Sequence, residues 1–158
     1  MSSQRRQAIL SQILPSALQL PFVYRVLEDS LIEDLDITQD KANLDADLTL
    51  FDVTSLATLP EDLNLSARIF AKEVGVIAGL PLAEAVFKLA HESLDFEALL
   101  PDGTAVQVGD ELARIAGPGR ALLIAERPAL NFLGRVSGVA SLTKHFVDQV
   151  AGTRAKIL

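Results

Sequence analysis

The C-terminal stretch of the chain, residues 117–158, reads GPGRALLIAERPALNFLGRVSGVASLTKHFVDQVAGTRAKIL. Its apolar residues recur three or four positions apart, which is the spacing of one face of a helix. They are Leu122, Ala129, Leu133, Val136, Ala140, Val147 and Val150. Helix ends are predicted near Gly119 and Pro128, because proline lacks the N–H that a helix interior uses. After Gly152 the pattern turns extended, which predicts the start of a strand at Ala155.

A polar row runs along the same segment. Arg127, Asn131 and Arg135 follow one another at four-residue intervals, which places them on one helical face. Beside them lie small residues that let another backbone or a ligand come close. They are Gly134, Ser137 and Gly138. We interpret the polar row as a candidate binding site. The alternative is that its two arginines are solvated and pair with the acidic half of the chain.

The charge distribution singles out the same region. Residues 114–158 hold seven Lys/Arg and two Asp/Glu, a net charge of +5, whereas residues 1–113 carry −12. A basic segment inside an acidic protein suits a small anionic ligand. A polyanion would be repelled by the rest of the chain, so nucleic acid is not an expected partner.

Composition limits the remaining possibilities. The chain has 158 residues, of which 49% are hydrophobic, and it has no cysteine. This length fits one domain, or one domain plus a fragment of another. Disulfides and thiolate chemistry are excluded, and His91 and His145 are too far apart in sequence to suggest a metal site. No apolar segment has the length of a membrane span, and no signal peptide is recognised, so we expect a cytoplasmic protein without membrane contact.

The first 65 residues give weaker patterns. Residues 1–14 either extend the first helix or are disordered. A helix is predicted between Pro21 and the acidic run 33–36, whose carboxylates we interpret as solvated. Residues 40–65 are difficult to assign, and one hairpin strand near Leu48–Val53 is expected.

From Leu65 onward the pattern is that of a small sheet with a covering helix. Strands are predicted at Ser66–Ala71 and Gly75–Gly79, followed by a helix that starts at Pro81. Residues 94–116 alternate between short extended segments and two tight turns. The expected fold is therefore α+β: an N-terminal α/β sandwich with a small, mostly antiparallel sheet and covering helices, followed by a longer helical segment.

Several motifs are specific to one enzyme family. They are ERPALNFL at 126–133, SGVASLT at 137–143, AGTRAKIL at 151–158, AKEVGVIAGL at 71–80, GPGRALL at 117–123 and EDLDIT at 33–38. These segments resemble quinolinate phosphoribosyltransferase, also called the carboxylating nicotinate-nucleotide pyrophosphorylase. The resemblance extends from about Leu31 to the last residue.

The resemblance implies a reaction and an architecture. Quinolinate and phosphoribosyl pyrophosphate yield nicotinate mononucleotide, carbon dioxide and pyrophosphate in NAD biosynthesis, with Mg²⁺. The implied fold is a sandwich domain, here residues 1–116, followed at 117–158 by a helical segment and the first strand of an α/β barrel. The family works as a dimer in which the sandwich of one subunit caps the barrel of the other.

The resemblance also implies site roles. Arg127 stands where the family places an arginine that reaches across the dimer interface to a quinolinate carboxylate, a task that suits a planar guanidinium. Asn131 and Arg135 are secondary candidates, and no catalytic or metal-binding residue is assigned. The sequence departs from the family pattern at Pro128 and Gly134, in the acidic motif, which lacks its usual glycines, and in a longer segment at 40–65.

The barrel loop that follows the AGTRAKIL strand in the family lies beyond Leu158. We therefore expect the 158-residue chain alone to be inactive, with no Mg²⁺ ligands of its own, and to need a homodimer or a completing barrel. Two alternatives remain open. The chain is a non-catalytic dimerisation or binding module derived from this fold, or a molybdenum-associated homologue of the same family.

Overall fold

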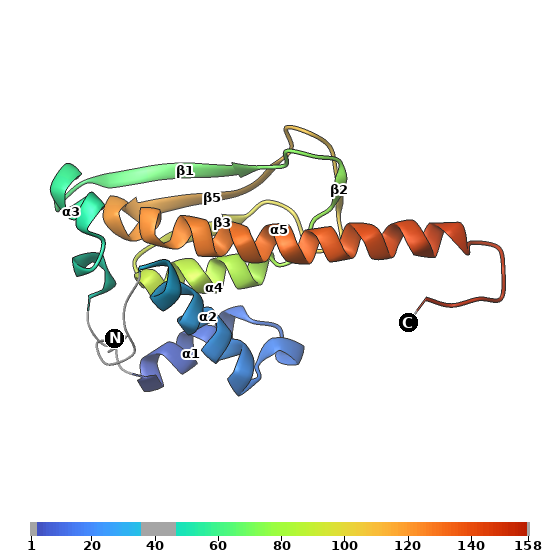
Figure 1. Cartoon of the computed structure of the whole chain (residues 1–158), viewed down its shortest axis with the longest axis horizontal. Helices are drawn as coiled ribbons and strands as arrows, with labels where there is room; N and C mark the ends of the chain where they lie inside the picture. The colour runs from blue at the N-terminus through green and yellow to red at the C-terminus, as the bar shows by residue number, and fades with distance from the viewer. Residues whose placement is uncertain (1–2, 36–46, 158) are drawn as a thin grey trace.

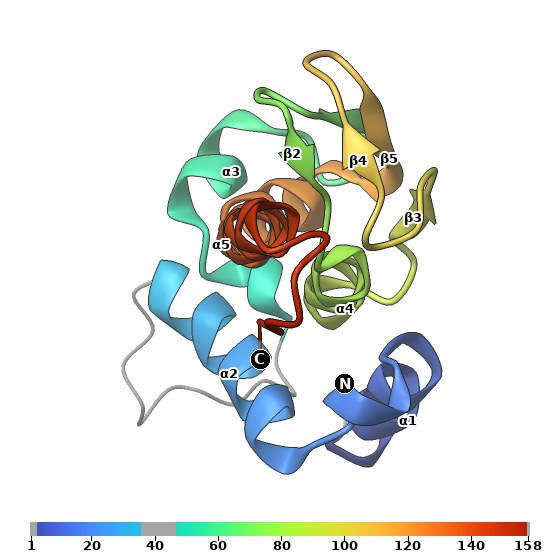
Figure 2. The ribbon, with the colours of Figure 1, turned by 90° about the vertical axis from the view of Figure 1, so that its right-hand side faces the viewer.

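The structure is a computed structural model that describes residues 3–35 and 47–157. Its elements form layers, with strands on one side, α4 and α5 in the middle, and α1 and α2 on the other side (Figures 1 and 2). In chain order they are α1 (Ser3–Ile13), η1 (Ser16–Leu18), α2 (Pro21–Asp34), η3 (Leu48–Leu50), α3 (Val53–Thr58), β1 (Asn64–Phe70), β2 (Gly75–Val76), α4 (Leu80–Ala90), β3 (Asp95–Ala98), β4 (Ala105–Val106), β5 (Glu111–Pro118) and α5 (Gly119–Gln149).

Two small antiparallel sheets confirm the predicted fold class. The larger has the strand order β1-β5-β3, and the smaller pairs β2 with β4. In the larger sheet Ile115 of β5 lies opposite Ala67 of β1 and Phe96 of β3. The strand predicted at Ser66–Ala71 is confirmed as β1, and the extended segments predicted within 94–116 are β3, β4 and β5. The helix predicted from Pro81 is α4, which begins one residue earlier. Residues 3–13 form a separate helix, α1, which η1 separates from α2, so the N-terminal segment is helical but does not extend α2.

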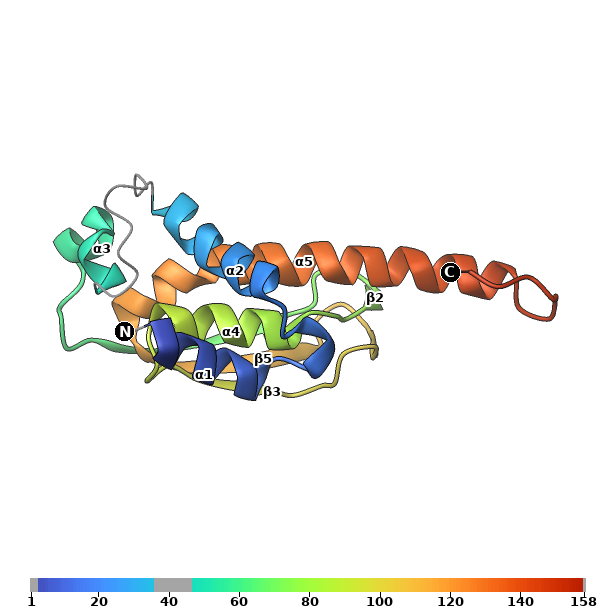
Figure 3. The same ribbon diagram turned by 90° about the horizontal axis from the view of Figure 1, so that it is seen from below.

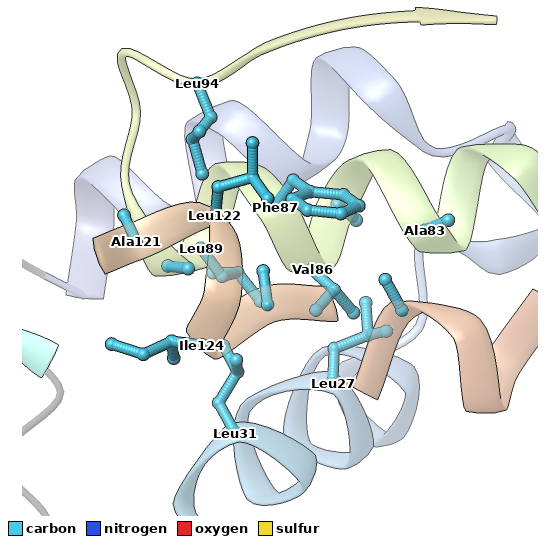
Figure 4. Packing of buried hydrophobic residues seen from close by; sticks show 14 of the residues in the cluster. Leu27, Leu31, Ala83, Val86, Phe87, Leu89, Leu94, Ala121, Leu122 and Ile124 are labelled. Atoms are coloured by element: carbon cyan, nitrogen blue, oxygen red, sulfur yellow. The ribbon is translucent and has the colours of Figure 1, made fainter. Parts of the chain in front are cut away.

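The main core lies where α4 packs between the larger sheet and the two N-terminal helices (Figure 3). Leu27 and Leu31 of α2 approach α4 and α5 from below, and Phe87 of α4 lies beside Leu122 of α5 (Figure 4). Leu94 caps the cluster from the loop before β3. All five side chains are at most 4% exposed, so this packing determines where α2 lies relative to α5.

The predicted helix break at Pro128 is wrong, because α5 runs unbroken from Gly119 to Gln149 with this proline inside it. An interior proline costs about 3 kcal/mol, since the carbonyl of Ile124 loses its donor. Ile124, Ala129 and Leu133 beside it are at most 4% exposed. Burying such leucine and isoleucine side chains contributes about 1.5–3 kcal/mol each, which offsets the cost.

The strand expected near Leu48–Val53 is also wrong. Leu48–Leu50 is a 3₁₀ turn, and a short helix, α3, begins at Val53. Asp47 accepts a hydrogen bond from the Thr49 N–H, and Asp52 accepts one from the Ser55 N–H. Aspartates that cap the next N–H groups in this way favour helical turns over a strand. The rest of the difficult segment, residues 40–46, lies outside the described residues, as do residues 36–38 of the acidic motif.

Two predicted extended segments differ from the structure. The strand at 75–79 is a strand only over Gly75–Val76. Ile77 still exchanges backbone hydrogen bonds with residues 103 and 104, and from Ala78 onward side chains take the backbone N–H groups. Asp102 accepts hydrogen bonds from the N–H groups of Gly79 and Leu80, at 2.8 and 3.0 Å, and so caps α4. The strand expected to start at Ala155 is wrong within the described part of the chain: residues 155–157 pair with no strand, and the Ala155 N–H donates to the Thr153 hydroxyl.

Candidate functional site

The predicted polar row lies in a hollow between α2 and α5. Its volume is about 580 Å³. The residues that line it are Val26, Asp29, Ser30, Glu33 and Asp34 from α2, and Arg127, Pro128, Asn131, Phe132 and Arg135 from α5. The structure therefore brings together Arg127, Asn131 and Arg135, as their four-residue spacing predicts. Their role as ligand-binding residues stays a prediction.

Arg127 is paired within the chain. Its Nη1 donates to Oδ1 of Asp34, the last residue of α2, at 3.0 Å. The arginine side chain is 76% exposed and the aspartate side chain 21% exposed. Arg135 has no ion-pair partner among the residues that the structure describes. The alternative stated above, pairing with the acidic half, thus holds for one of the two arginines.

The acidic side of this hollow was not predicted as part of the site. Asp29, Glu33 and Asp34 face the two arginines across it. A carboxylate ligand would meet the guanidinium fork of Arg127 and, at the same time, the field of these acids. The signal that identifies them is the spacing of Asp29 and Glu33 at i and i+4 on the predicted helix, which places them on one face. The acidic run had been interpreted only as a solvated loop.

A second hollow of about 380 Å³ also borders the ion pair. Asp34 and Arg127 line both hollows. Asp52 and Glu126 contribute further carboxylates to the second hollow. This hollow is more acidic than the first, and an anionic ligand is expected to avoid it.

The small residues of α5 face a third region. A Cβ added at Gly134 or Gly138 would meet nothing within 4 Å, and both glycines line a hollow of about 520 Å³ beside the segment 69–77. The Ser137 and Ser141 hydroxyls instead hold the backbone of Ala78 and Val76. A neighbouring backbone therefore comes close at Ser137, as predicted, whereas the close approach predicted at Gly134 and Gly138 is not made by any described residue.

A metal centre is not formed by the described residues. Across residues 3–35 and 47–157, no three His, Asp or Glu side chains gather in a set that could hold a metal ion. The same residues include no helix both long enough and apolar enough to pass through a membrane.

Comparison with known proteins identifies relatives. Residues 52–137, more than half of the chain, match the family described as quinolinate phosphoribosyl transferase, N-terminal domain. A carboxylating, chloroplastic nicotinate-nucleotide pyrophosphorylase from Oryza sativa subsp. japonica is 43% identical over 97 residues, which are 61% of this chain and 26% of that protein. A mitochondrial, decarboxylating quinolinate phosphoribosyltransferase 2a from Nicotiana tabacum is 39% identical over 74% of this chain and 32% of its own length.

Solved structures agree with the sequence match. NadC from Streptococcus pyogenes superposes with a TM-score of 0.73 at 32% identity, over 87% of this chain and 45% of that one. The nicotinate-nucleotide pyrophosphorylase from Ehrlichia chaffeensis gives a TM-score of 0.67 at 30% identity, over 81% of this chain and 42% of its own. The chain spans less than half the length of each of these relatives. The chain belongs to the family of quinolinate phosphoribosyl transferase N-terminal domains.

Proposed function

We propose that this chain supplies the N-terminal part of a quinolinate phosphoribosyltransferase of NAD biosynthesis, in which Arg127 binds a carboxylate of quinolinate. The observation that carries the proposal is the exposed guanidinium of Arg127 at the edge of the hollow between α2 and α5, within a chain of this family. Only Nη1 is used by Asp34, so the remaining N–H donors face solvent and are available to a ligand.

The contribution of this chain to the reaction is electrostatic. In the proposed reaction the pyridine nitrogen of quinolinate attacks the ribosyl carbon, pyrophosphate leaves, and carbon dioxide is then lost. A cation at the carboxylate stabilises the negative charge and orients the ring for attack. Arg127 donates to that carboxylate, and Arg135, two turns further along α5, adds positive potential. Asn131 lies between them and offers an amide N–H.

The rest of the active site comes from a partner in this proposal. A homodimer or a completing barrel provides the contacts to phosphoribosyl pyrophosphate, and residues 1–116 act as the sandwich unit while residues 117–158 lead into the barrel. Mg²⁺ is expected for the full reaction. The described residues do not offer a donor set that fits it. A cytoplasmic location stays a prediction, since the relatives named above include chloroplastic and mitochondrial proteins.

Titration of quinolinate, followed by NMR chemical shifts of backbone amides, tests the proposal. The acidic side of the hollow keeps affinity low, and we expect a dissociation constant of about 1 mM or weaker. Shifts are expected to cluster on α5 around Arg127 and to be lost in Arg127→Ala. Arg154→Ala is the matched control, because it removes the same charge from a residue outside the hollow. Saturable shifts that persist in Arg127→Ala, or no shifts at all in the parent chain, would overturn the assignment of Arg127.

The reaction itself is tested by complementation. The chain is mixed with the part of Streptococcus pyogenes NadC that lies outside the 45% matched here, and formation of nicotinate mononucleotide is followed. Turnover is expected in the mixture and not in either piece alone. A mixture that forms a complex and yet remains inactive contradicts the proposed enzymatic role.

One observation favours a second candidate, a non-catalytic binding module. The C-terminal half of α5 extends beyond the other elements and carries Val139, Leu142 and Phe146, which are 67%, 57% and 50% exposed (Figure 1). Such a face suits a partner surface. Analytical ultracentrifugation separates the two candidates. Self-association indicates that this face lacks the partner it packs against, which favours the N-terminal part of an enzyme. A monodisperse monomer favours the non-catalytic binding module. The molybdenum-associated homologue stays an alternative, which saturable quinolinate binding would disfavour.

A further inference from the structure

We infer that Asp34 is a positioning residue for Arg127. The inference rests on the proposed function, because it concerns how the guanidinium is presented to a carboxylate. Asp34 holds the long Arg127 side chain in one position before a ligand binds, and it does not occupy all the N–H donors that the ligand needs.

The first step is the geometry of the pair. Asp34 Oδ1 accepts a single hydrogen bond, from Nη1 of Arg127, at 3.0 Å. A guanidinium has five N–H donors in a planar fork, so the edge formed by Nε and Nη2 is left for another planar acceptor. The exposures agree with this division: the arginine side chain is 76% exposed, whereas the aspartate is 21% exposed. Asp34 therefore holds the guanidinium from the protein side and leaves its outer side open.

The second step is the rigidity of the support. Asp34 is the last residue of α2, and the N–H of the next residue, Leu35, donates to Leu31. Leu27 and Leu31 are 1% and 0% exposed in the core against α4 and α5 (Figure 4). The carboxylate is thus attached to a helix end whose position is fixed by packing. A hydrogen bond to such a support restricts a rotamer-rich side chain in advance, which reduces the entropy lost on binding.

The third step is what the arginine would do without Asp34. The pair borders both the hollow of the polar row and the second hollow, which Asp52 and Glu126 also line. Glu126 is exposed and shares the second hollow with Arg127, so a released guanidinium has an alternative carboxylate there. Asp34 keeps Arg127 directed to the side where Asn131 and Arg135 lie.

The electrostatic effect of the Asp34 charge opposes its positioning effect, so the test needs a control. The negative charge of Asp34 also repels an anionic ligand, and removing it strengthens anion binding by Coulomb's law alone. Glu33 lies in the same hollow, next to Asp34 in sequence, and has no ion pair with Arg127. Glu33→Gln therefore removes the same charge without removing the contact, and Asp34→Asn removes both. The comparison of these two near-isosteric variants isolates the positioning effect.

The test has two measurements on the chain and both variants. The first is ¹⁵N relaxation of the Arg127 Nε–H group without ligand. We expect an ordered side chain in the parent and in Glu33→Gln, and a mobile one in Asp34→Asn. Equal order in all three would overturn the inference, and so would mobility in the parent. Backbone amide spectra verify that each variant is folded.

The second measurement is the quinolinate titration. Asp34→Asn is expected to bind about two- to tenfold more weakly than Glu33→Gln, which corresponds to the cost of ordering one long side chain. Equal or tighter binding by Asp34→Asn would overturn the positioning role. If the parent chain itself does not bind quinolinate, the proposed function fails instead, and the relaxation measurement alone decides whether Asp34 holds Arg127.

Discussion

The hydroxyl of Ser137 forms hydrogen bonds with both backbone groups of Ala78: it accepts from the N–H at 3.0 Å and donates to the carbonyl at 3.1 Å. One turn further along α5, Ser141 accepts from the Val76 N–H at 2.8 Å. Each hydroxyl therefore takes the place of a strand partner for a segment where β2 has only two paired residues. These contacts define the position of α5 relative to the small sheet.

Ser137→Ala is expected to destabilise the chain by about 1–3 kcal/mol, because two partly buried backbone groups of Ala78 lose their partner. Urea denaturation followed by circular dichroism measures the change. Thr143→Ala, on the exposed face of the same helix, is the control and should stay within about 0.5 kcal/mol of the parent. A loss of similar size in both variants would mean that the contact with Ala78 does not set the effect, because alanine has the higher helix propensity and cannot by itself cause a loss.

Gly75→Ala tests the same interface from the other side. A Cβ at Gly75 would lie 2.6 Å from the Ser141 hydroxyl, so that side chain has to rotate and release Val76. In a Ser141→Ala background the nearest side-chain atom is the Cβ at 3.6 Å, an ordinary contact. The double variant is thus expected to be about as stable as Ser141→Ala alone, with a coupling of roughly 1 kcal/mol in the denaturation cycle. Additive changes in the free energy of unfolding would contradict a clash between a Cβ at position 75 and the Ser141 hydroxyl.

The structure leaves room for a side chain at Gly134, so its replacement is harmless to packing. A Cβ there meets nothing within 4 Å, and the residue is in the interior of α5. Gly134→Ala is expected to stabilise the chain by about 0.5–1 kcal/mol. Gly152→Ala is the contrast, since its φ of 82° disfavours a side chain despite equally open space. Thermal denaturation should move the two midpoints in opposite directions.

Glu84 predicts a pH dependence of stability. Burial raises the pKa of the Glu84 carboxyl above its ordinary value of 4.5, and the charge of Lys88 lowers it by less. The folded chain then keeps this proton to a higher pH than the unfolded chain, so its contribution favours folding at low pH. That contribution is lost as the pH rises from about 4.5 through the folded pKa. Glu84→Gln should therefore be more stable than the parent at pH 7, with the difference disappearing near pH 4.

Denaturation at a series of pH values between 4 and 7 measures the stability difference between Glu84→Gln and the parent. Glu111→Gln is expected to change the pH dependence of stability in the opposite direction, because the hydrogen bond from Arg114 lowers the pKa of Glu111. Its stabilising contribution is present at neutral pH and is lost as the pH falls through the lowered pKa. A stability difference between the parent and Glu84→Gln that is independent of pH would exclude the effect of burial.

Arg135 is expected to act through its field alone. Arg135→Gln should weaken quinolinate binding roughly twofold at low salt, a loss that corresponds to one charge about two helical turns away. Added salt should reduce that difference, because the guanidinium is exposed and screened. A complete loss of binding, like that expected for Arg127→Ala, would instead indicate direct contact with the ligand.

Periodicity predicted the parts of this molecule that local patterns determine. The four-residue spacing of Arg127, Asn131 and Arg135 placed them on one face, and all three line one hollow. It did not predict that Pro128 continues the helix, since the compensation comes from burial of Ile124 and Leu133 against elements that are far away in sequence. Nor did it identify Asp34 as the partner of Arg127, because 93 residues separate them and only the packing of α2 on α5 brings them together.

The apolar row of α5 shows a further limit of sequence patterns. Its early members Leu122, Ala129 and Leu133 are buried, whereas Val147 is 44% exposed. Both halves have the same spacing. Periodicity therefore reports which residues share a face, and the length of the neighbouring elements decides which part of that face is covered.

Core and site share the same two turns of α5. Ala125 and Ala129 are fully buried, while Arg127 and Asn131 line the hollow between α2 and α5. Each residue of an α-helix advances the face by about 100°. A single inserted residue upstream of Arg127 would therefore turn either the arginine into the core or the alanines into solvent. Because the two sets cannot be rotated independently, any chain that keeps this core also keeps the direction in which the Arg127 side chain leaves the helix.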